Sequence, residues 1–198
     1  ISDVMMQGLS GIELCSRVKE DPSLSHIPVV LLTASSSPEI KLKGIEGGAD
    51  DYISKPFEKE LLVARVTGIL KSKNNLQKYF YNEITLKSND LKISADYKEF
   101  LATCIALVEE HLIDSDFCIK TLADEIGMSQ SNLYKKIRSI SGQSTNAFIR
   151  FIRLRKAAEM FLNTDCTVAE AAYKVGINDL KYFREQFNKV FGMNPSDY

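Results

Sequence analysis

Two stretches in the second half of the chain repeat the same order of residue types, and this repeat limits the fold more than any other feature. They are residues 122–142 and residues 171–192. In each, a small residue is followed three positions later by an apolar residue and then by a glycine. These positions are Ala123, Ile126 and Gly127 in the first copy, and Ala172, Val175 and Gly176 in the second. A small residue lets two helices approach closely, and a glycine ends a helix because it adopts positive φ at little cost. The repeat therefore predicts two helical hairpins.

A second helix is expected after each glycine. An apolar residue and a polar helix cap come first: Met128 and Ser129 in the first copy, Ile177 and Asn178 in the second. Apolar residues then recur at helical spacing, as Leu133, Ile137 and Ile140 and as Phe183, Phe187 and Phe191. This is the spacing of a helix-turn-helix motif. One such pattern is often a plain helical hairpin, but two in tandem, with turn glycines 49 residues apart, are much more specific.

The other faces of the two second helices are polar and carry the candidate binding residues. They are Gln130, Ser131, Asn132, Tyr134, Lys135 and Arg138 in the first copy, and Lys181, Tyr182, Arg184, Glu185, Asn188 and Lys189 in the second. Such side chains can pair with base edges in a major groove, and the cations can neutralise phosphates. We therefore expect double-stranded DNA as a partner.

The net charge of −1 conceals an uneven distribution. Segment 126–158 has seven basic residues and no acidic one, whereas segment 96–125 has two basic and eight acidic residues. A local positive field attracts phosphates. On charge alone, a solvated helix face is the alternative interpretation of the basic segment.

Residues 96–198 resemble an AraC-type (AraC/XylS) DNA-binding domain over its whole length. The motifs that carry this resemblance are residues 122–129, 142–144, 153–158 and 192–198. The resemblance implies an all-α domain of seven helices, in two subdomains joined by a long helix at about Thr145–Leu162, which enters successive major grooves. The sequence departs from the family pattern at Leu180 and at Cys118, where a serine cap is usual; losing that cap costs about 1 kcal/mol.

The first 70 residues alternate between two patterns. Helical patterns cover residues 11–20, 38–47 and 58–70, and strand-like patterns cover 27–32 and 51–54. Alternating strands and helices imply a parallel sheet. Residues 71–95 are polar and turn-rich, and we interpret them as a linker. Two pairs have capping-box spacing: Asp96 with Glu99, and Thr167 with Glu170.

Three polar residues follow or end the expected strands. They are Asp3, Thr33 and Lys55. Because the carboxyl ends of parallel strands meet at one edge, we expect these side chains to converge. Together they suit phosphoryl capture, with the carboxylate as acceptor and the hydroxyl and ammonium as oxygen partners. Singly, each has an ordinary alternative as a surface, capping or solvated residue.

Residues 1 to about 70 resemble a response-regulator receiver domain, which has a flavodoxin-like fold. The motifs are residues 2–6, 31–34 and 54–57. The resemblance implies phosphorylation of Asp3 by a histidine kinase, Thr33 and Tyr52 as a switch pair, Lys55 as a phosphate partner and a cis Lys55–Pro56 bond. Gln7 replaces the usual proline.

The same family binds Mg²⁺ through an acidic pair on a strand that would precede Ile1. We therefore expect a truncated receiver with no complete metal site and no cofactor here, although Mg²⁺ is expected for the intact receiver. On this interpretation the segment alone does not autophosphorylate, and its sheet has an open edge.

Composition bounds the setting. No apolar run approaches the roughly 20 residues of a membrane span, so we expect no membrane contact by this segment. Four widely spaced cysteines without a Cys-x-x-Cys pattern, and only two histidines, favour reduced thiols in the cytoplasm over disulfides or a metal site. The start has neither an initiator methionine nor a signal-peptide pattern, so we expect a piece of a longer chain.

The leading hypothesis is a sequence-specific DNA-binding transcription regulator, not an enzyme, at the output end of a two-component phosphorelay. A histidine kinase domain, on the same parent chain or a separate one, is an expected partner, and pairing of two copies stays open. One alternative is a protein-interaction module of a signalling kinase that does not touch DNA. An enzyme of phosphoryl transfer is the other, but no glycine-rich nucleotide loop or phosphoacceptor histidine motif supports it.

Overall fold

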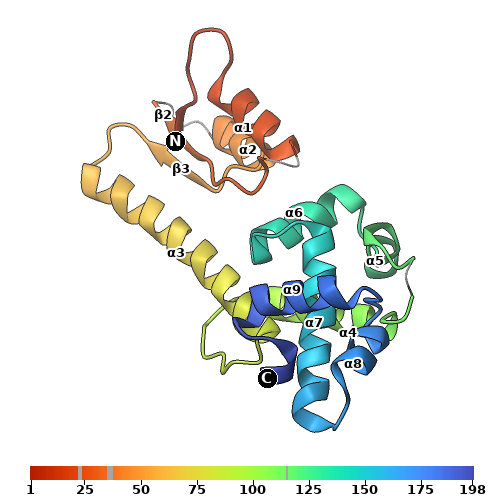
Figure 1. Cartoon of the computed structure of the whole chain (residues 1–198). Coiled ribbons are helices and arrows are strands. Elements are labelled where there is room, and N and C mark those ends of the chain that lie inside the picture. Colours follow the sequence, from red (N-terminus) through yellow and green to blue (C-terminus); the bar gives the residue numbers. More distant parts are fainter. Residues whose placement is uncertain (22–23, 35–37, 115) are drawn as a thin grey trace. The chain divides into compact units, whose positions relative to one another are not determined.

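Figure 1 shows the computed structural model of the chain, which describes residues 1–198 except 22–23, 35–37 and 115. The chain divides into two compact units, Ile1–Asn74 and Asn75–Tyr198. One helix, α3 (Lys59–Ile84), contributes residues to both units. None of the helices in these described ranges is both long and apolar enough to cross a membrane.

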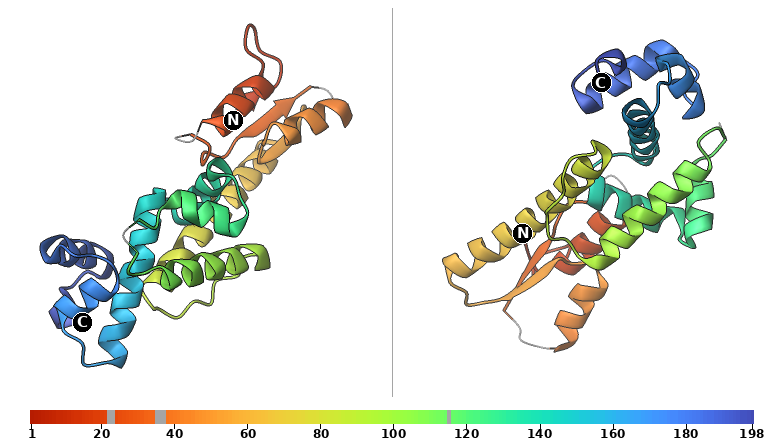
Figure 2. Two further views of the ribbon diagram at one scale, coloured as in Figure 1. Left: turned by 90° about the vertical axis from the view of Figure 1, so that its right-hand side faces the viewer. Right: turned by 90° about the horizontal axis from the view of Figure 1, so that it is seen from below.

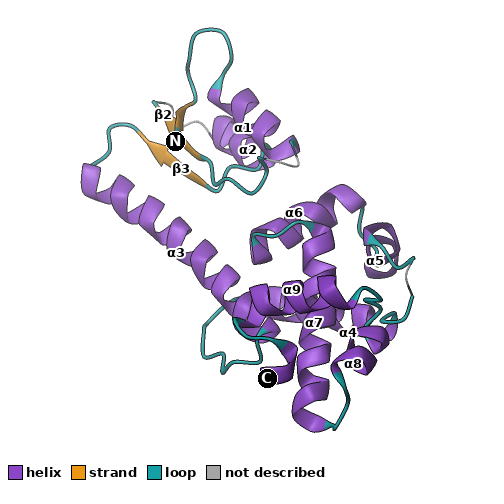
Figure 3. Ribbon diagram, in the orientation of Figure 1, coloured by secondary structure: helices purple, strands orange, loops and turns teal. Residues whose placement is uncertain are grey.

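The first unit is built on a small parallel sheet (Figure 3). Its strands are β1 (Ser2–Asp3), β2 (Val30–Thr33) and β3 (Asp51–Ser54), in the order β1-β2-β3. Helices α1 (Gly11–Glu20) and α2 (Pro38–Glu46) connect them. The predicted α/β class and parallel sheet are confirmed.

The start of β2 follows from local chemistry. Strand β2 begins at Val30, not at Ile27 as the apolar run suggests, because Pro28 has no N–H to donate to a ladder. Val29 and Leu31 are buried with Val4 and Cys15 in the core of this unit.

The interpretation of residues 71–95 as a linker needs correction. Helix α3 does not end near Leu70 but continues to Ile84, and neither glycine nor proline interrupts it after Gly68. Phe80 and Ile84 are 2% and 0% exposed and belong to the core of the second unit. Burial of these two apolar side chains outweighs the weak helix propensity of the polar residues before them. Within 71–95, only residues 85–94 lack helix and strand.

The second unit is helical, as predicted. After α3 come α4 (Ala95–Glu110), α5 (Ile119–Ile126), α6 (Gln130–Ser141), α7 (Thr145–Asn163), α8 (Val168–Lys174), α9 (Leu180–Phe191) and a short 3-10 helix, η1 (Pro195–Asp197). With η1 counted, the described part of 95–198 holds the seven helices that the resemblance implies. Helix α7 matches the predicted long helix and packs against α4, α6, α8 and α9 (Figures 1 and 2).

Both helix-turn-helix motifs form, as α5–α6 and α8–α9. In the first, Gly127 ends α5 with a φ of 73°, and Ser129 caps α6 by accepting a hydrogen bond from the Asn132 N–H. In the second, Asn178 is not the cap. Asp179 takes that role and accepts a 3.0 Å hydrogen bond from the Tyr182 N–H, because its carboxylate is a stronger acceptor than an amide oxygen.

The two predicted capping boxes have different outcomes. Thr167 and Glu170 form one at the start of α8, with hydrogen bonds of 2.8 and 3.3 Å in the two directions. Asp96 and Glu99 do not, because α4 begins at Ala95 with Ser94 as its N-cap, two residues before Asp96. Cys118 is the N-cap residue of α5 and makes no side-chain capping bond, in line with the departure noted in the sequence.

The end of α3 is anchored by aromatic packing in the second unit. The Phe80 ring stacks on Phe148 of α7 at a centroid distance of 5.2 Å. Arg155 Nε donates to the Glu83 carbonyl at 3.1 Å, and the Tyr81 hydroxyl donates to the Val190 carbonyl at 3.0 Å. Residues 80–84 are therefore a structural part of the helical unit.

We expect Phe80→Ala to lower the free energy of unfolding of the second unit by about 3–5 kcal/mol, because it removes a fully buried ring. Urea denaturation followed by circular dichroism measures this. Lys78→Ala, two residues earlier on an exposed position of the same helix, is the control and should change stability by less than about 0.5 kcal/mol. Equal, small effects of both changes would contradict the packing of α3 described above.

Candidate nucleic-acid interface

The helices α6 and α9 expose the side chains that the sequence singled out. On α6, Gln130, Ser131 and Asn132 are exposed, and Tyr134, Lys135 and Arg138 are half-buried. On α9, Lys181, Tyr182, Arg184, Glu185, Asn188 and Lys189 are all exposed. The opposite faces are buried through Leu133, Ile137 and Ile140 and through Phe183, Phe187 and Val190. Each second helix therefore has one anchored apolar face and one accessible polar face.

The close helix approach that the repeat predicts is present. Ala123 of α5 and Ala172 of α8 are both fully buried. Phe191, expected to anchor α9, is only half-buried, but its ring stacks on Phe187 at 4.3 Å. Val190 takes the fully enclosed position instead.

The basic segment 126–158 is not a free positive field. Five of its seven cations are engaged within the domain: Lys136 lies 4.1 Å from the Phe100 ring, Arg150 bonds Tyr182, Arg153 bonds backbone carbonyls, and Arg155 and Lys156 pair with glutamates. Lys135 and Arg138, both in the predicted set, are the two cations of this segment that make no hydrogen bond, ion pair or aromatic contact with the described residues.

The acidic and basic segments are in fact partners. Glu109 of α4 pairs with Arg155 at 3.0 Å and with Lys156 at 2.9 Å, and Glu159 closes the cluster from α7 at 2.7 and 3.3 Å. The hydrogen bond from Lys156 to Glu109 raises the pKa of the lysine. The charge asymmetry along the sequence thus helps to join α4 to α7.

One of the predicted binding residues, Tyr182, is held by a side chain that the sequence did not indicate. Arg150 Nη1 of α7 donates to the Tyr182 hydroxyl at 2.9 Å, and its guanidinium lies 6.0 Å from the ring centre. Arg150 lies in the basic segment 126–158, and this was the sequence signal that could have indicated its role. Tyr182 is therefore presented from α9 in a fixed position.

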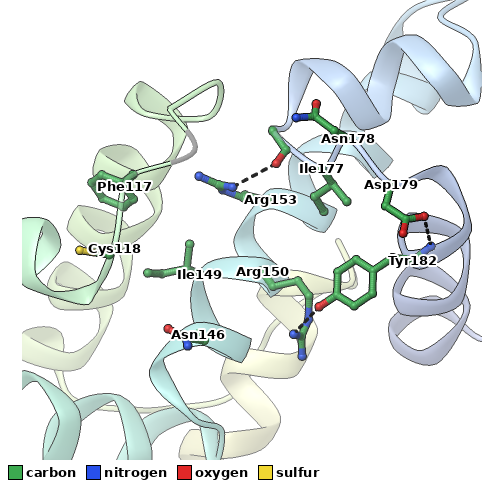
Figure 4. A pocket seen from close by; sticks show the side chains of 11 residues that line it. Phe117, Cys118, Asn146, Ile149, Arg150, Arg153, Ile177, Asn178, Asp179 and Tyr182 are labelled. Atoms are coloured by element: carbon green, nitrogen blue, oxygen red, sulfur yellow. Dashed lines mark hydrogen bonds between the residues drawn. The ribbon is translucent and has the colours of Figure 1, made fainter.

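A cleft of about 410 Å³ separates the two motifs (Figure 4). It is bounded by the residues before α5, the first half of α7 and the turn before α9. Figure 4 shows Arg150 reaching Tyr182 on one side of the cleft and Arg153 reaching the turn of the second motif on the other.

In the first unit the structure brings the predicted phosphoryl residues to one sheet edge. Asp3, Thr33 and Lys55 lie at or just beyond the ends of β1, β2 and β3. Lys55 Nζ forms an ion pair with the Asp3 carboxylate, which also accepts a 3.2 Å bond from the Met5 N–H. Both bonds lower the pKa of Asp3, and the one from Lys55 has the larger effect. The predicted cis Lys55–Pro56 bond is present.

The two residues of the predicted switch pair, Thr33 and Tyr52, lie in different surroundings. Thr33 is buried at the end of β2, and its carbonyl accepts a 2.6 Å bond from the Lys55 N–H. Tyr52 packs its ring close to Gly44 of α2, where an added Cβ would lie 2.9 Å from Cε2. Its hydroxyl is buried without a hydrogen-bond partner among the described residues.

The donor set at this edge does not fit a magnesium ion. Mg²⁺ requires near-octahedral oxygen coordination, and Asp3 is already paired with Lys55. No group of three or more His, Cys, Asp or Glu side chains that could hold a metal occurs in the described part of the chain. The described residues therefore do not form a metal site on their own.

Two family models match the chain. Residues 1–67 match the response regulator receiver domain, and residues 122–198 match a helix-turn-helix domain. The chain therefore carries a receiver segment followed by a helix-turn-helix domain of the AraC type. Neither of these domains is an enzyme domain, and the receiver family is consistent with Mg²⁺ binding in general.

Two curated relatives match different shares of the chain. Over all 198 residues the chain is 37% identical to histidine kinase P4 of Formosa agariphila, and it spans 14% of the length of that protein. The phosphate regulon transcriptional regulatory protein PhoB of Pseudomonas aeruginosa is 48% identical over 69 residues, which cover 35% of this chain and 30% of PhoB.

Among solved structures, the C-terminal domain of AraT, a response regulator from Geobacillus stearothermophilus, is 28% identical. The match covers 50% of this chain and 81% of that domain, with a TM-score of 0.42.

We expect Glu109→Gln to lower the free energy of unfolding of the AraC-type domain by about 1–2 kcal/mol, because Arg155 and Lys156 each lose a charged acceptor. Glu110→Gln, on the exposed neighbouring position, is the matched control and should have an effect below about 0.5 kcal/mol.

The same pair of variants tests the electrostatic origin of this effect. Because the pKa of Lys156 is raised above 10.5 by Glu109, the lysine contributes stability below its ordinary pKa and loses it as pH rises through the raised value. The difference between wild type and Glu109→Gln should therefore shrink above that pH, and also in 1 M salt. A difference that depends on neither would indicate a packing effect instead.

Proposed function

We propose that this chain regulates transcription by binding specific DNA sequences, and that its receiver makes this binding respond to phosphorylation. The observation that carries the proposal is the pair of accessible polar helix faces, on α6 and α9, each presented by its own helix-turn-helix motif. Two recognition helices on one polypeptide suit two neighbouring major-groove segments of one operator.

The chemistry of these faces supports base reading. Gln130 and Asn132 offer amide groups, which can bond adenine bidentately, and Arg184 offers a fork that fits guanine. Lys135 and Lys189 can neutralise phosphates. All of these residues belong to the set that we propose as the DNA contacts, together with Ser131, Tyr134, Arg138, Lys181, Tyr182, Glu185 and Asn188.

For the receiver we propose that Asp3 accepts a phosphoryl group from a histidine kinase domain. A phosphorylated Asp3 would keep Lys55 as its partner, because the ammonium can pair with the new oxygens. Thr33 and Tyr52 are the residues whose surroundings we propose to change with it, and Mg²⁺ is a proposed requirement of the intact receiver.

The parent protein and the setting are part of the proposal. A relative that matches the whole chain is named a histidine kinase, which supports a parent chain that carries its own kinase. Because operator DNA is cytoplasmic in bacteria, we propose action there. For the boundaries we propose a receiver at 1–70 and a DNA-binding domain that begins near residue 75 and includes 96–198; pairing of two copies on DNA remains part of the proposal.

A specific observation favours a second candidate, a protein-interaction module that does not touch DNA. Most cations of segment 126–158 are engaged internally, and the net charge of the chain is −1. Such a module would bind its partner through the same exposed faces of α6 and α9. DNA binding is the better proposal because Lys135, Arg138, Lys181, Arg184 and Lys189 leave five cations on those faces.

Binding-site selection from random duplexes, followed by titration at several salt concentrations, tests the proposal. We expect an enriched sequence in two parts. Lys135→Ala should lower affinity for all sequences and reduce the salt slope by about one, and Arg184→Ala should lower affinity for the selected site by about 1–3 kcal/mol.

Lys78→Ala removes one exposed cation outside both motifs and is the control for net charge. It should leave affinity and sequence preference nearly unchanged. A selected pool that does not differ from the starting pool would reject DNA reading and favour the interaction module.

Phosphorylation is tested in the full-length protein that contains this chain. We expect Asp3→Asn to abolish the hydroxylamine-labile label that the cognate kinase transfers, because the acceptor carboxylate is gone. Asp51→Asn, an acidic residue at the start of β3, is the control and should retain the label. Undiminished labelling of Asp3→Asn would show that another residue is the acceptor.

A further inference from the structure

We propose that Arg153 of α7 is a positioning residue that fixes the separation of the two recognition helices and thereby sets the half-site spacing that the protein accepts. This inference rests on the proposed DNA binding, but its structural part can be tested without DNA. Arg153 was not among the residues that the sequence indicated.

The Arg153 guanidinium forms hydrogen bonds on the sides of both motifs. Arg153 Nη2 donates at 2.8 Å to the Asp114 carbonyl, on the segment that leads into α5. Arg153 Nη1 donates at 3.4 Å to the Gly176 carbonyl, in the turn between α8 and α9 (Figure 4). One side chain on the connecting helix therefore ties the entrance of the first motif to the turn of the second.

The backbone of Gly176, which Arg153 contacts, also lies close to the backbone of Leu112. A Cβ added to Gly176 would lie 2.2 Å from the Leu112 carbonyl oxygen and 3.1 Å from Arg153 Nη1. The equivalent turn glycine of the first motif, Gly127, has no atom within 4 Å of such a Cβ. Both glycines have positive φ, but of the two only Gly176 is also required for a close approach, between the turn of the second motif and the segment that leads from α4 to α5.

An arginine suits position 153 better than a lysine. The Arg153 side chain is half-buried, and burial lowers its pKa although Asp114 acts in the opposite direction. A partly desolvated cation needs firm partners. The planar fork of arginine donates to two carbonyls in different directions, whereas a single ammonium on a flexible stem is not pre-organised for this.

Arg150 adds to the same device. It lies three residues earlier on α7 and holds Tyr182 of α9 from the other side of the cleft. The second motif is therefore fixed to α7 at two places, its turn through Arg153 and its recognition helix through Arg150. Rotation of the second motif about α7 would break both.

Half-site spacing is the property that such a strut should control. Inserting one base pair shifts one half-site by about 3.4 Å and rotates it by about one tenth of a turn relative to the other. Two motifs held at a fixed separation cannot follow this change, whereas two motifs joined only through apolar contacts with α7 can adapt.

The binding experiment uses the selected operator and two derivatives, with one base pair removed or added between the half-sites. Wild type should lose about tenfold or more in affinity on each derivative. Arg153→Ala and Arg153→Lys should both reduce this loss to about threefold or less, with an unchanged salt slope, because Arg153 is not proposed to contact phosphate. Lys174→Ala changes an exposed residue of α8 and is the control. It should keep the wild-type ratio of affinities for the operator and its two derivatives.

A distance measurement in the free protein tests the strut itself. Spin labels are placed at Ser131 and Lys189 after Cys118 and Cys166 are changed to serine. Wild type and Lys174→Ala should give one narrow distance distribution, and Arg153→Ala a broader or shifted one, with circular dichroism confirming that each variant is folded.

The outcomes separate the two proposals. A narrow distribution in Arg153→Ala identical to wild type would overturn the strut, whether or not DNA binds. A distribution that broadens while wild type selects no DNA would support the strut and reject the proposed function. Binding with an unchanged spacing preference in Arg153→Ala would retain DNA reading and overturn the control of spacing.

Discussion

The packing of α7 against its neighbours is the constraint on which the second unit depends. Phe148, Ile152, Leu154, Ala157 and Ala158 are buried along its length. Helices α4, α6, α8 and α9 all pack against it. Because both helix-turn-helix motifs share this one helix, neither has a complete core of its own. Helix α7 helps to cover the apolar faces of α6 and α9, while their polar faces stay accessible.

Polar contacts complete what apolar packing begins. Packing through small and apolar residues fixes how near two helices lie, but it is not directional. The Glu109 cluster joins α4 to α7, and Arg150 and Arg153 join α7 to the second motif. Most of the positive charge in segment 126–158 is therefore used for architecture, and only a minority of it remains for a polyanion.

Sequence periodicity predicted the elements whose determinants are local. Gly127 and Gly176, Ser129 and the Thr167 capping box all follow from residues within a few positions of one another, and the extent of α7 was implied by the family resemblance. The extent of α3, the Asp179 cap and the roles of Arg150 and Arg153 did not follow in this way. Phe80 is helical because of Phe148, 68 residues later, and Arg153 meets Asp114 and Gly176, partners that no helical period connects. At the sheet edge, the convergence of Asp3 with Lys55 was predictable because parallel topology brings strand ends together.

Helix α3 belongs to two folding units at once, and this has a consequence for how such proteins diversify. Its last turns stack Phe80 on Phe148 of α7 and bond the Val190 carbonyl of α9 through Tyr81. Exchanging the first unit for another at residue 95 would remove the ring that stacks on Phe148, whereas an exchange made upstream of Asn75 would keep it. Recombination between proteins of this architecture should therefore favour crossover points inside α3, where the boundary between the two units lies within a continuous stretch of α-helix.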